Sequence, residues 1–137
     1  MPLHLDIVTP EKKVFSDTVD NVYLPGADGE LGVLPMHAGL VTGLKPGELR
    51  YLHDGQVVIL AIGSGFAEIT QEKVVVITDM ALGEAEIDEQ SAEEAIQRAQ
   101  ETLRTVEHSL DAEQVAYLQG IISRSAAAIQ FKRKHHH

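Results

Sequence analysis

The residues whose types could support catalysis do not stand at catalytic spacings. Gly63-Ser64-Gly65 lacks the G-x-S-x-G order of a nucleophile elbow, and no strand-turn-helix pattern surrounds it. His4, His37 and His53 show neither the His-x-His nor the His-Glu-x-x-His spacing that would predict a zinc site. The chain has no cysteine, which excludes disulfides, thiolate nucleophiles and cysteine-ligated metals. We therefore expect no catalytic residue and no metal site, and we interpret Gly63-Ser64-Gly65 as a tight bend before a strand.

A different pattern favours contact with another protein. The stretch from Gly29 to His37 reads Gly-Glu-Leu-Gly-Val-Leu-Pro-Met-His and lies between two strand-like runs. We expect Glu30 to be exposed, because a carboxylate in a glycine turn is rarely buried without a partner. His37 is either a buried histidine bonded to a backbone carbonyl or an exposed contact residue. The stretch predicts a binding edge, not a catalytic pocket.

Composition narrows the functional classes. The chain has 137 residues and a formal net charge of -10, which argues against binding to a nucleic-acid backbone. Its mass of 14.9 kDa fits one domain, or one domain with a small appendage. The longest apolar run, Val57 to Ile62, is far shorter than the ~20 residues of a membrane span. No secretion signal is evident, so we expect a protein that is neither inserted into a membrane nor secreted.

The elements that position these residues fall into two halves. From Leu3 to about Ala81, short runs rich in Val, Ile and Leu alternate with turn residues, which predicts strands. The Asp54-Gly55 pair between two such runs predicts a hairpin with positive φ. Several such strands cannot bury their faces singly. We therefore expect them to form a β-sandwich.

After Asp79 the apolar spacing changes to three or four residues, which predicts two helices joined by a short turn at His108 to Leu110. Ser91 with Glu94 fits a capping box for the first helix, and Asp88 is the alternative cap. Asp111 with Gln114 fits the same arrangement for the second helix. The expected fold class is α+β: an N-terminal β-sandwich over residues 1–84, followed by an antiparallel helical hairpin over residues 85–134.

The expected hairpin is weakly self-sufficient, because alanine makes up much of its apolar stripe. A fully buried larger side chain contributes about 1.5 to 3 kcal/mol, but ordering each backbone residue costs about 1 to 2 kcal/mol. We expect the hairpin to lean on the sandwich or on a partner. An element of this kind can dock in more than one place, as a switch requires.

Collinear motifs along the chain resemble those of the epsilon subunit of F-type ATP synthases, of the bacterial type. The stretch from Gly29 matches the family pattern G-x-L-G-[IV]-L-P-x-H-A-P-L, with Gly39 in place of the second proline. The other matching segments are Ile7-Val8-Thr9-Pro10, Phe15, Leu40, Gly47-Glu48-Leu49 and Gly63 to Glu68. The resemblance implies the same sandwich and hairpin that the periodicity predicts.

The resemblance also implies a function. Family members are non-catalytic subunits of the rotating central stalk, in which the sandwich binds the gamma subunit and rests on the c-ring. The residues that match the contact motif are Glu30, Leu31, Gly32 and His37. In the family the hairpin can extend along gamma toward the alpha and beta subunits and suppress ATP hydrolysis. The basic residues that match this role are Arg124, Lys132, Arg133 and Lys134, with Arg98 and Arg104 as further candidates.

Some family members bind ATP through an [IL]-D-x-x-R-A motif. Ile87, Asp88 and Ala92 match it, with Arg98 as a further candidate, but Ser91 replaces the arginine and removes a bidentate phosphate donor. ATP is thus at most a regulatory ligand, and no other cofactor is expected. The resemblance places the protein on the cytoplasmic face of the bacterial plasma membrane as a peripheral part of the complex.

Two questions remain open from the sequence: the origin of the final histidines and an alternative function. The final residues His135 to His137 are either the remnant of a purification tag, a native tail or a zinc-binding tract. The alternative function is a stand-alone ligand- or nucleotide-sensing β-domain with a helical lid. We expect no nucleic-acid partner in either case.

Overall fold

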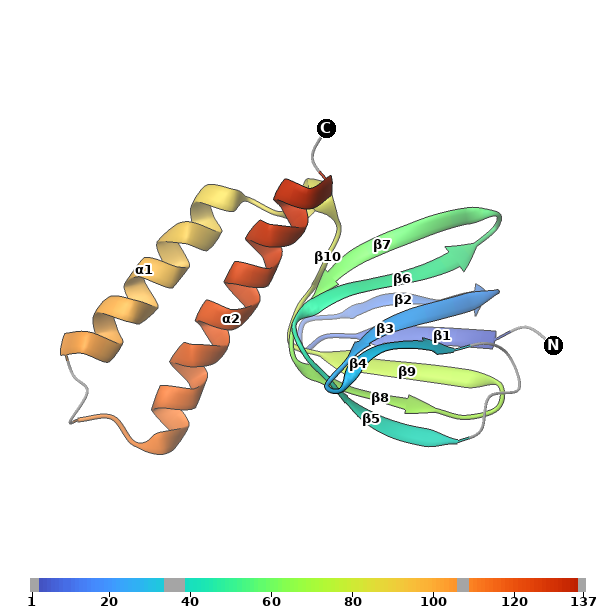
Figure 1. Cartoon of the computed structure of the whole chain (residues 1–137), viewed down its shortest axis with the longest axis horizontal. Helices are drawn as coiled ribbons and strands as arrows, with labels where there is room; N and C mark the ends of the chain where they lie inside the picture. Colours follow the sequence, from blue (N-terminus) through green and yellow to red (C-terminus); the bar gives the residue numbers. More distant parts are fainter. Residues whose placement is uncertain (1–2, 34–38, 106–108, 136–137) are drawn as a thin grey trace.

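The computed structural model of the protein describes residues 3–33, 39–105 and 109–135. A strongly curved sheet forms one part, and a helical hairpin stands against one end of it (Figure 1). The strands are β1 (Leu3–Val8), β2 (Lys13–Val19), β3 (Asn21–Gly26), β4 (Gly29–Val33), β5 (Leu40–Leu44), β6 (Gly47–His53), β7 (Gln56–Ile62), β8 (Gly65–Ile69), β9 (Lys73–Thr78) and β10 (Ala81–Leu82). The helical elements are the short η1 (Glu84–Glu86), α1 (Glu89–Thr105) and α2 (Ala112–His135). The predicted α+β class is confirmed.

The ten strands form one continuous sheet that wraps into a sandwich with a barrel-like outline. Their order is β10-β7-β6-β3-β5-β8-β9-β1-β2, and β4 pairs with β3 outside this path. Neighbours are antiparallel except β1 and β9, which are parallel. This arrangement turns one face of each strand inward. Leu3, Leu5 and Ile7 of β1 are fully buried there, as the alternation predicts.

Two hairpins depend on residues that accept positive φ. Asp54 and Gly55, between β6 and β7, have φ of 50° and 78°, which confirms the turn predicted from the Asp-Gly pair. Between β3 and β4, Gly29 has φ of 132°. A Cβ atom on the facing Gly26 would lie 2.7 Å from the Gly29 carbonyl oxygen. The β3–β4 hairpin therefore closes tightly only with glycine at both positions.

The helix caps correct one expectation. The Asp88 carboxylate accepts the backbone N–H of Ser91 at 3.1 Å and α1 begins at Glu89, so Asp88 is the cap and the Ser91 capping box is wrong. Ser91 stands inside the first turn, where its N–H needs an acceptor. For α2, Asp111 and Gln114 exchange side-chain to backbone hydrogen bonds of 2.8 and 3.0 Å, which confirms the predicted capping box.

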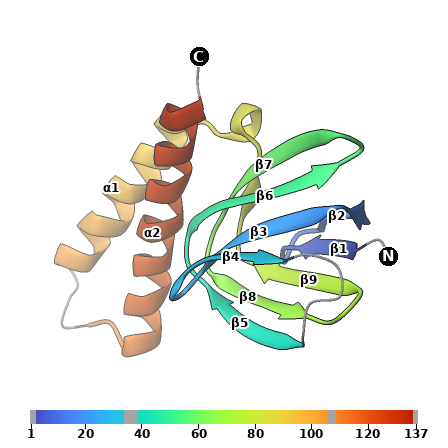
Figure 2. The ribbon, with the colours of Figure 1, turned by 45° about the vertical axis from the view of Figure 1, so that its right-hand side comes forward.

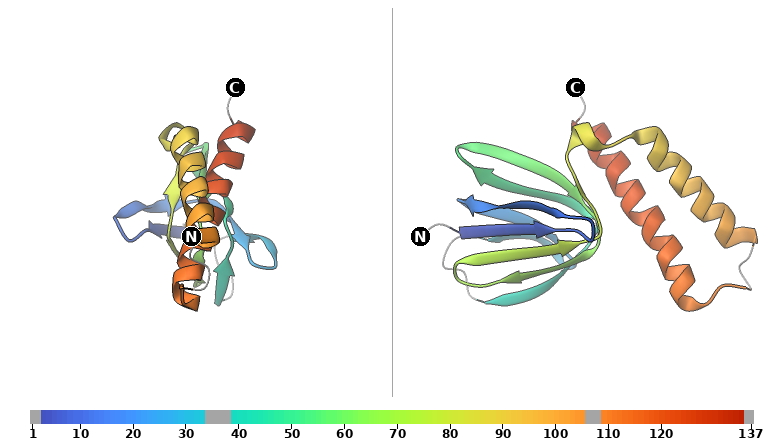
Figure 3. Two further views of the ribbon diagram at one scale, coloured as in Figure 1. Left: turned by 90° about the vertical axis from the view of Figure 1, so that its left-hand side faces the viewer. Right: turned by 180° about the vertical axis from the view of Figure 1, so that it is seen from behind.

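The hairpin contacts the sandwich through α2, whereas α1 packs on α2 and stands farther from the strands (Figures 2 and 3). Phe131 and Ala128 of α2 join Ala61 of β7 and Ile87 of the linker in a small apolar cluster separate from the main core. In the described part of α1, only Ala99 is buried. The expectation that the hairpin leans on the sandwich is confirmed. Within the described residues, neither helix is both long and apolar enough to span a membrane.

Candidate functional surfaces

The predicted contact edge is the strand β4 with its neighbours β3 and β6. Glu30 stands on β4 with 55% of its side chain exposed, as expected, and its carboxylate lies 3.2 Å from the Arg50 guanidinium of β6. The same guanidinium lies 4.5 Å from the ring centroid of Tyr23 on β3. Three neighbouring strands thus hold one charged group, Glu30, in place at the surface.

Gly32 is part of this arrangement for a steric reason. Tyr23 lies opposite Gly32 in the β3–β4 register, and a Cβ atom on Gly32 would lie 2.9 Å from the Tyr23 ring. The ring can cross β4 and support Arg50 only because residue 32 has no side chain. Leu31 points the other way and packs half-buried against the core. His37 lies outside the described residues, so its assignment stays a prediction.

A second open surface, which sequence reasoning missed, covers the outer face of β5, β8 and β9. Phe66 of β8 is 46% exposed beside Ile77 of β9, its direct partner in the register. Val41 of β5 is 68% exposed on the same side, and Glu68 is its register partner on β8. The sequence predicts strands β8 and β9, but both carry apolar residues on both faces. Which face points into the core is therefore not predictable without the strand register. The patch is apolar and carries one carboxylate.

The basic candidates of α2 are all engaged within the molecule. Lys132 donates to the backbone carbonyl of Ile87 at 2.7 Å and lies 3.4 Å from that of Glu84. Arg133 pairs with Glu89 and Glu93 of α1. Both sets of contacts remain within the hairpin and its linker.

Two further cations of α2 reach across to the sandwich. Arg124 lies 3.5 Å from the Asp79 carboxylate in the bend after β9. Lys134 lies 3.2 Å from the Glu48 carboxylate of β6, and the neighbouring His135 ring lies 3.0 Å from the same oxygen. The structure therefore brings Lys134 and His135 together on one acidic residue.

The pKa values of Glu48 and Asp79, the two sandwich carboxylates that pair with α2, are shifted in opposite directions. Burial works to raise the pKa of Glu48, but hydrogen bonds from His135 and Lys134 outweigh it and hold that pKa below its usual value. For Asp79, burial raises the pKa above its usual value, although Arg124 and the backbone N–H groups of Asp79 and Ser64 oppose the shift. The Glu48 carboxylate therefore depends on α2, whereas the Asp79 carboxylate also has backbone partners.

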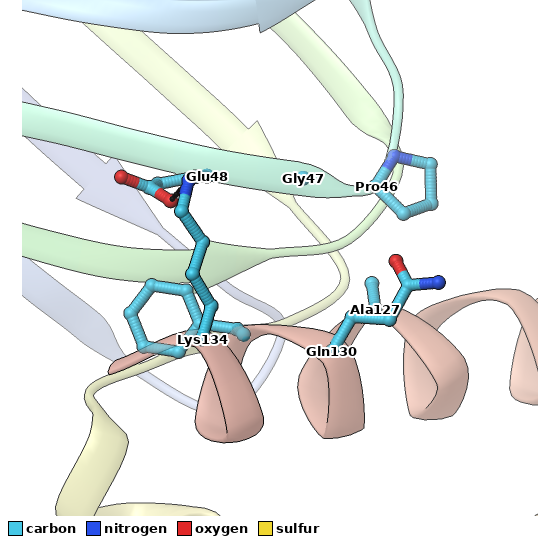
Figure 4. Close-up of a pocket in the computed structure, with 7 residues that line it drawn as sticks. Pro46, Gly47, Glu48, Ala127, Gln130 and Lys134 are labelled. Carbon is cyan, nitrogen blue, oxygen red and sulfur yellow. Dashed lines mark hydrogen bonds and ion pairs between the residues drawn. The ribbon is translucent and has the colours of Figure 1, made fainter. Parts of the chain in front are cut away.

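A groove opens where α2 meets the start of β6. Its inner part has a volume of about 200 Å³, with Pro46 and Gly47 on one side and Ala127, Gln130 and Phe131 on the other. Figure 4 shows Lys134 crossing the groove toward Glu48. A neighbouring hollow continues past Lys45 to Arg50 and Glu30. The ion pair of Glu48 and Lys134 thus bridges the groove between the hairpin and the sandwich.

The four nucleotide candidates do not converge on this groove. Ile87 is buried in the apolar cluster, and Asp88 caps α1. The backbone N–H of Ser91 lowers the pKa of Asp88. Ala92 is half-buried, and Arg98 is exposed nearly three turns along α1. Nucleotide binding through these residues stays a prediction. Among the described residues, no cluster of three metal-ligating side chains occurs.

A polar cluster on the outer face of β1 is also absent from the sequence interpretation. Ser16 donates to the nearly buried Asp6 carboxylate at 2.5 Å, and Lys73 lies 3.4 Å from the same group. The Nε2 atom of His4 lies 3.1 Å from Asp6 and 3.3 Å from Ser16. A catalytic triad uses opposite ring nitrogens for its acid and its serine, so this arrangement is not one. The cluster satisfies Asp6 on a sheet face and lowers its pKa.

Comparison with known proteins gives one consistent result. Residues 2–84 match the family model described as ATP synthase, Delta/Epsilon chain, beta-sandwich domain. The ATP synthase epsilon chain of Desulforamulus reducens is 48% identical over 107 residues, which are 78% of this chain and 81% of that one. The ATP synthase epsilon chain of Nitrosococcus oceani is 41% identical over 112 residues, 81% of this chain and 80% of that one.

Solved structures show the same fold at lower identity. A chain in the structure of the Euglena gracilis mitochondrial ATP synthase, with OSCP, F1 and c-ring, has a TM-score of 0.67 and 22% identity over 92% of this chain and 78% of that one. A chain in the central stalk and c-ring structure of the Tetrahymena thermophila mitochondrial ATP synthase has a TM-score of 0.56 and 12% identity. That match covers 98% of this chain and 96% of the other.

Proposed function

The chain belongs to the family of ATP synthase epsilon chains, which are non-catalytic subunits of that complex, and from this premise we propose that it works in the rotor. In this role the sandwich attaches to the gamma subunit and rests on the c-ring, which couples ion translocation to ATP synthesis. The hairpin inhibits ATP hydrolysis when it leaves the sandwich. The observation that supports this most directly is the division of the molecule into a well-packed sandwich and a hairpin attached to it through α2.

Two surfaces of the sandwich suit two different partners. The apolar face around Phe66 and Ile77 has the composition of an interface core and is proposed to bind gamma. The edge around Glu30 and Gly32 is polar and held by Arg50, and it is proposed to rest on the c-ring. The protein would then lie at the cytoplasmic face of the bacterial plasma membrane as a peripheral subunit.

The hairpin carries the proposed inhibitory contacts. Arg124, Lys132, Arg133 and Lys134 are engaged within the molecule when α2 lies on the sandwich. Arg124 and Lys134 can meet acidic loops of the alpha and beta subunits only after α2 leaves the sandwich, because their partners lie there. The folded hairpin is therefore the non-inhibitory arrangement in this proposal.

Co-purification with gamma tests the proposed attachment. We expect tagged gamma to retain the full chain, and Phe66→Asp to weaken retention at least tenfold, because it places a charge in the apolar face. Val57→Asp is the matched control, since Val57 is also an exposed apolar residue, on β7, but lies outside that face. Retention of Phe66→Asp at the level of Val57→Asp would exclude this face as the gamma site. Failure of the unaltered chain to bind gamma would reject the stalk role itself.

A further inference from the structure

Among the described residues, two carboxylates of the sandwich form ion pairs with α2. Arg124 pairs with Asp79, and Lys134 with His135 pairs with Glu48. The contacts of Arg133 are with α1, and those of Lys132 are with the linker before α1. When the hairpin swings away as a unit, Arg133 keeps its partners, whereas the contacts of α2 with Asp79, with Glu48 and with the apolar cluster must break.

We propose that Glu48 is the latch residue that holds the hairpin on the sandwich and competes with the partner subunits for the cations at the end of α2. The inference rests on the proposed function, because it specifies how the same hairpin is regulated. Glu48 is not in contact with a catalytic group. It acts by setting the balance between the docked and the released hairpin.

Glu48 is distinguished from Asp79 by its partners. The backbone groups of Asp79 and Ser64 lower the pKa of Asp79 independently of α2, so its carboxylate does not rely on Arg124 alone. Among the described residues, the hydrogen bonds to the Glu48 carboxylate come from Lys134 and His135. Its side chain is only 21% exposed with α2 in place. Release of α2 therefore removes both hydrogen-bond donors of Glu48. The docked state is stabilised by these two charge-assisted contacts, and the contact with Asp79 matters less because Asp79 does not rely on α2 alone.

The apolar part of the docking interface is small, so the charges can decide the balance. Phe131 and Ala128 bury against Ala61 and the linker residue Ile87, with only partly buried side chains around them, namely Ile59, Met80 and Leu82. Farther along α2, no residue before Ala128 is buried. A partner that offers carboxylates to Lys134 meets competition mainly from Glu48. The latch therefore makes release sensitive to the acidic surface of a partner and to salt.

The absence of cysteine allows a direct test on the isolated full chain. Spin labels are attached at Asp28→Cys in the β3–β4 turn and at Gln119→Cys in α2, both exposed, and their distance distribution is measured. In the unaltered background we expect one short-distance population. Glu48→Gln should lower the ratio of docked to released hairpin by roughly tenfold, because it removes a charge-assisted pair. Glu72→Gln, an exposed carboxylate away from α2, is the matched control.

Charge exchange separates the latch from a general loss of stability. Glu48→Lys should release the hairpin, and adding Lys134→Glu should restore docking, while the thermal unfolding midpoint of the sandwich stays within a few degrees. A distance distribution for Glu48→Gln equal to that of Glu72→Gln would overturn the proposal, as would failure of the exchanged pair to restore docking. These distances are measured without any partner. They therefore test the latch independently of the hydrolysis assay that tests the inhibitory role.

Discussion

At the scale of single residues, the contact edge depends on a side chain that is missing. Gly32 leaves room for Tyr23, which supports Arg50, which in turn holds Glu30. Each step has a steric or electrostatic reason, so the position of Glu30 is a property of three strands. The family motif marks Glu30 and Gly32, but neither Tyr23 nor Arg50 is visible as a partner until the strand register is known.

This dependence gives a stability prediction. Gly32→Ala should lower the free energy of unfolding by about 1 to 3 kcal/mol, because the new methyl group overlaps the Tyr23 ring. Gly43→Ala is the matched control on β5, where the nearest atom to the new Cβ lies at 3.9 Å. Urea unfolding of both variants measures the difference. Equal stability of the two would contradict the packing assigned to Gly32.

At the scale of elements, the periodicity of the sequence is enough to find most strands and both helices. The Asp54-Gly55 turn and the Asp111 cap follow from local chemistry, and both are confirmed. The start of the first helix does not follow from local chemistry, because Asp88 and Ser91 both fit an N-cap. The hydrogen bond from the Ser91 N–H to the Asp88 carboxylate identifies Asp88 as the cap. Ion pairs such as Glu48 with Lys134 join residues far apart in sequence. No local pattern predicts them, since they depend on where α2 docks.

Docking of α2 should depend on pH through Glu48. Its pKa is lowered while α2 is docked, and we expect the pKa to return toward its ordinary value after release, because both hydrogen-bond donors leave with α2. The contribution of Glu48 to docking is therefore fully present above that ordinary value, and it is lost as the pH falls through the lowered pKa. The groups facing Glu48 are Lys134 and His135 of α2, with Lys45 and Arg50 beside the same groove.

The stability of the fold depends on Asp79 with the opposite sign, because burial of Asp79 outweighs its contact with Arg124. Its pKa is raised, so its contribution is present below the ordinary value and lost as the pH rises through the raised pKa. The groups that act on it are Arg124 and Glu11. The spin-label distances should therefore be followed from pH 7 to about 3 in the original chain and in Glu48→Gln. The docked fraction should fall in acid more steeply in the original chain, and parallel curves would contradict the assignment to Glu48.

At the scale of the whole molecule, the sandwich and the hairpin are stabilised by different interactions. The sandwich has a continuous buried core drawn from most of its strands, whereas the hairpin buries few side chains and relies on charges at one end. A unit of this kind suits a role in which one part stays attached and the other moves. The outer face around Phe66 and the edge around Glu30 remain open while the hairpin is docked. In the proposed function, attachment and regulation thus depend on different residues.

Removing the hairpin in the assembled complex tests this account most directly. A chain that ends at Asp88 keeps all strands and loses α1 and α2. ATP hydrolysis and proton-driven ATP synthesis are measured in complexes with this chain and in complexes with the full chain carrying Glu72→Gln. The account predicts that the truncated chain still assembles and supports synthesis, while hydrolysis rises severalfold. Hydrolysis that remains at the level of the full chain, in a complex that has assembled, would contradict an inhibitory hairpin.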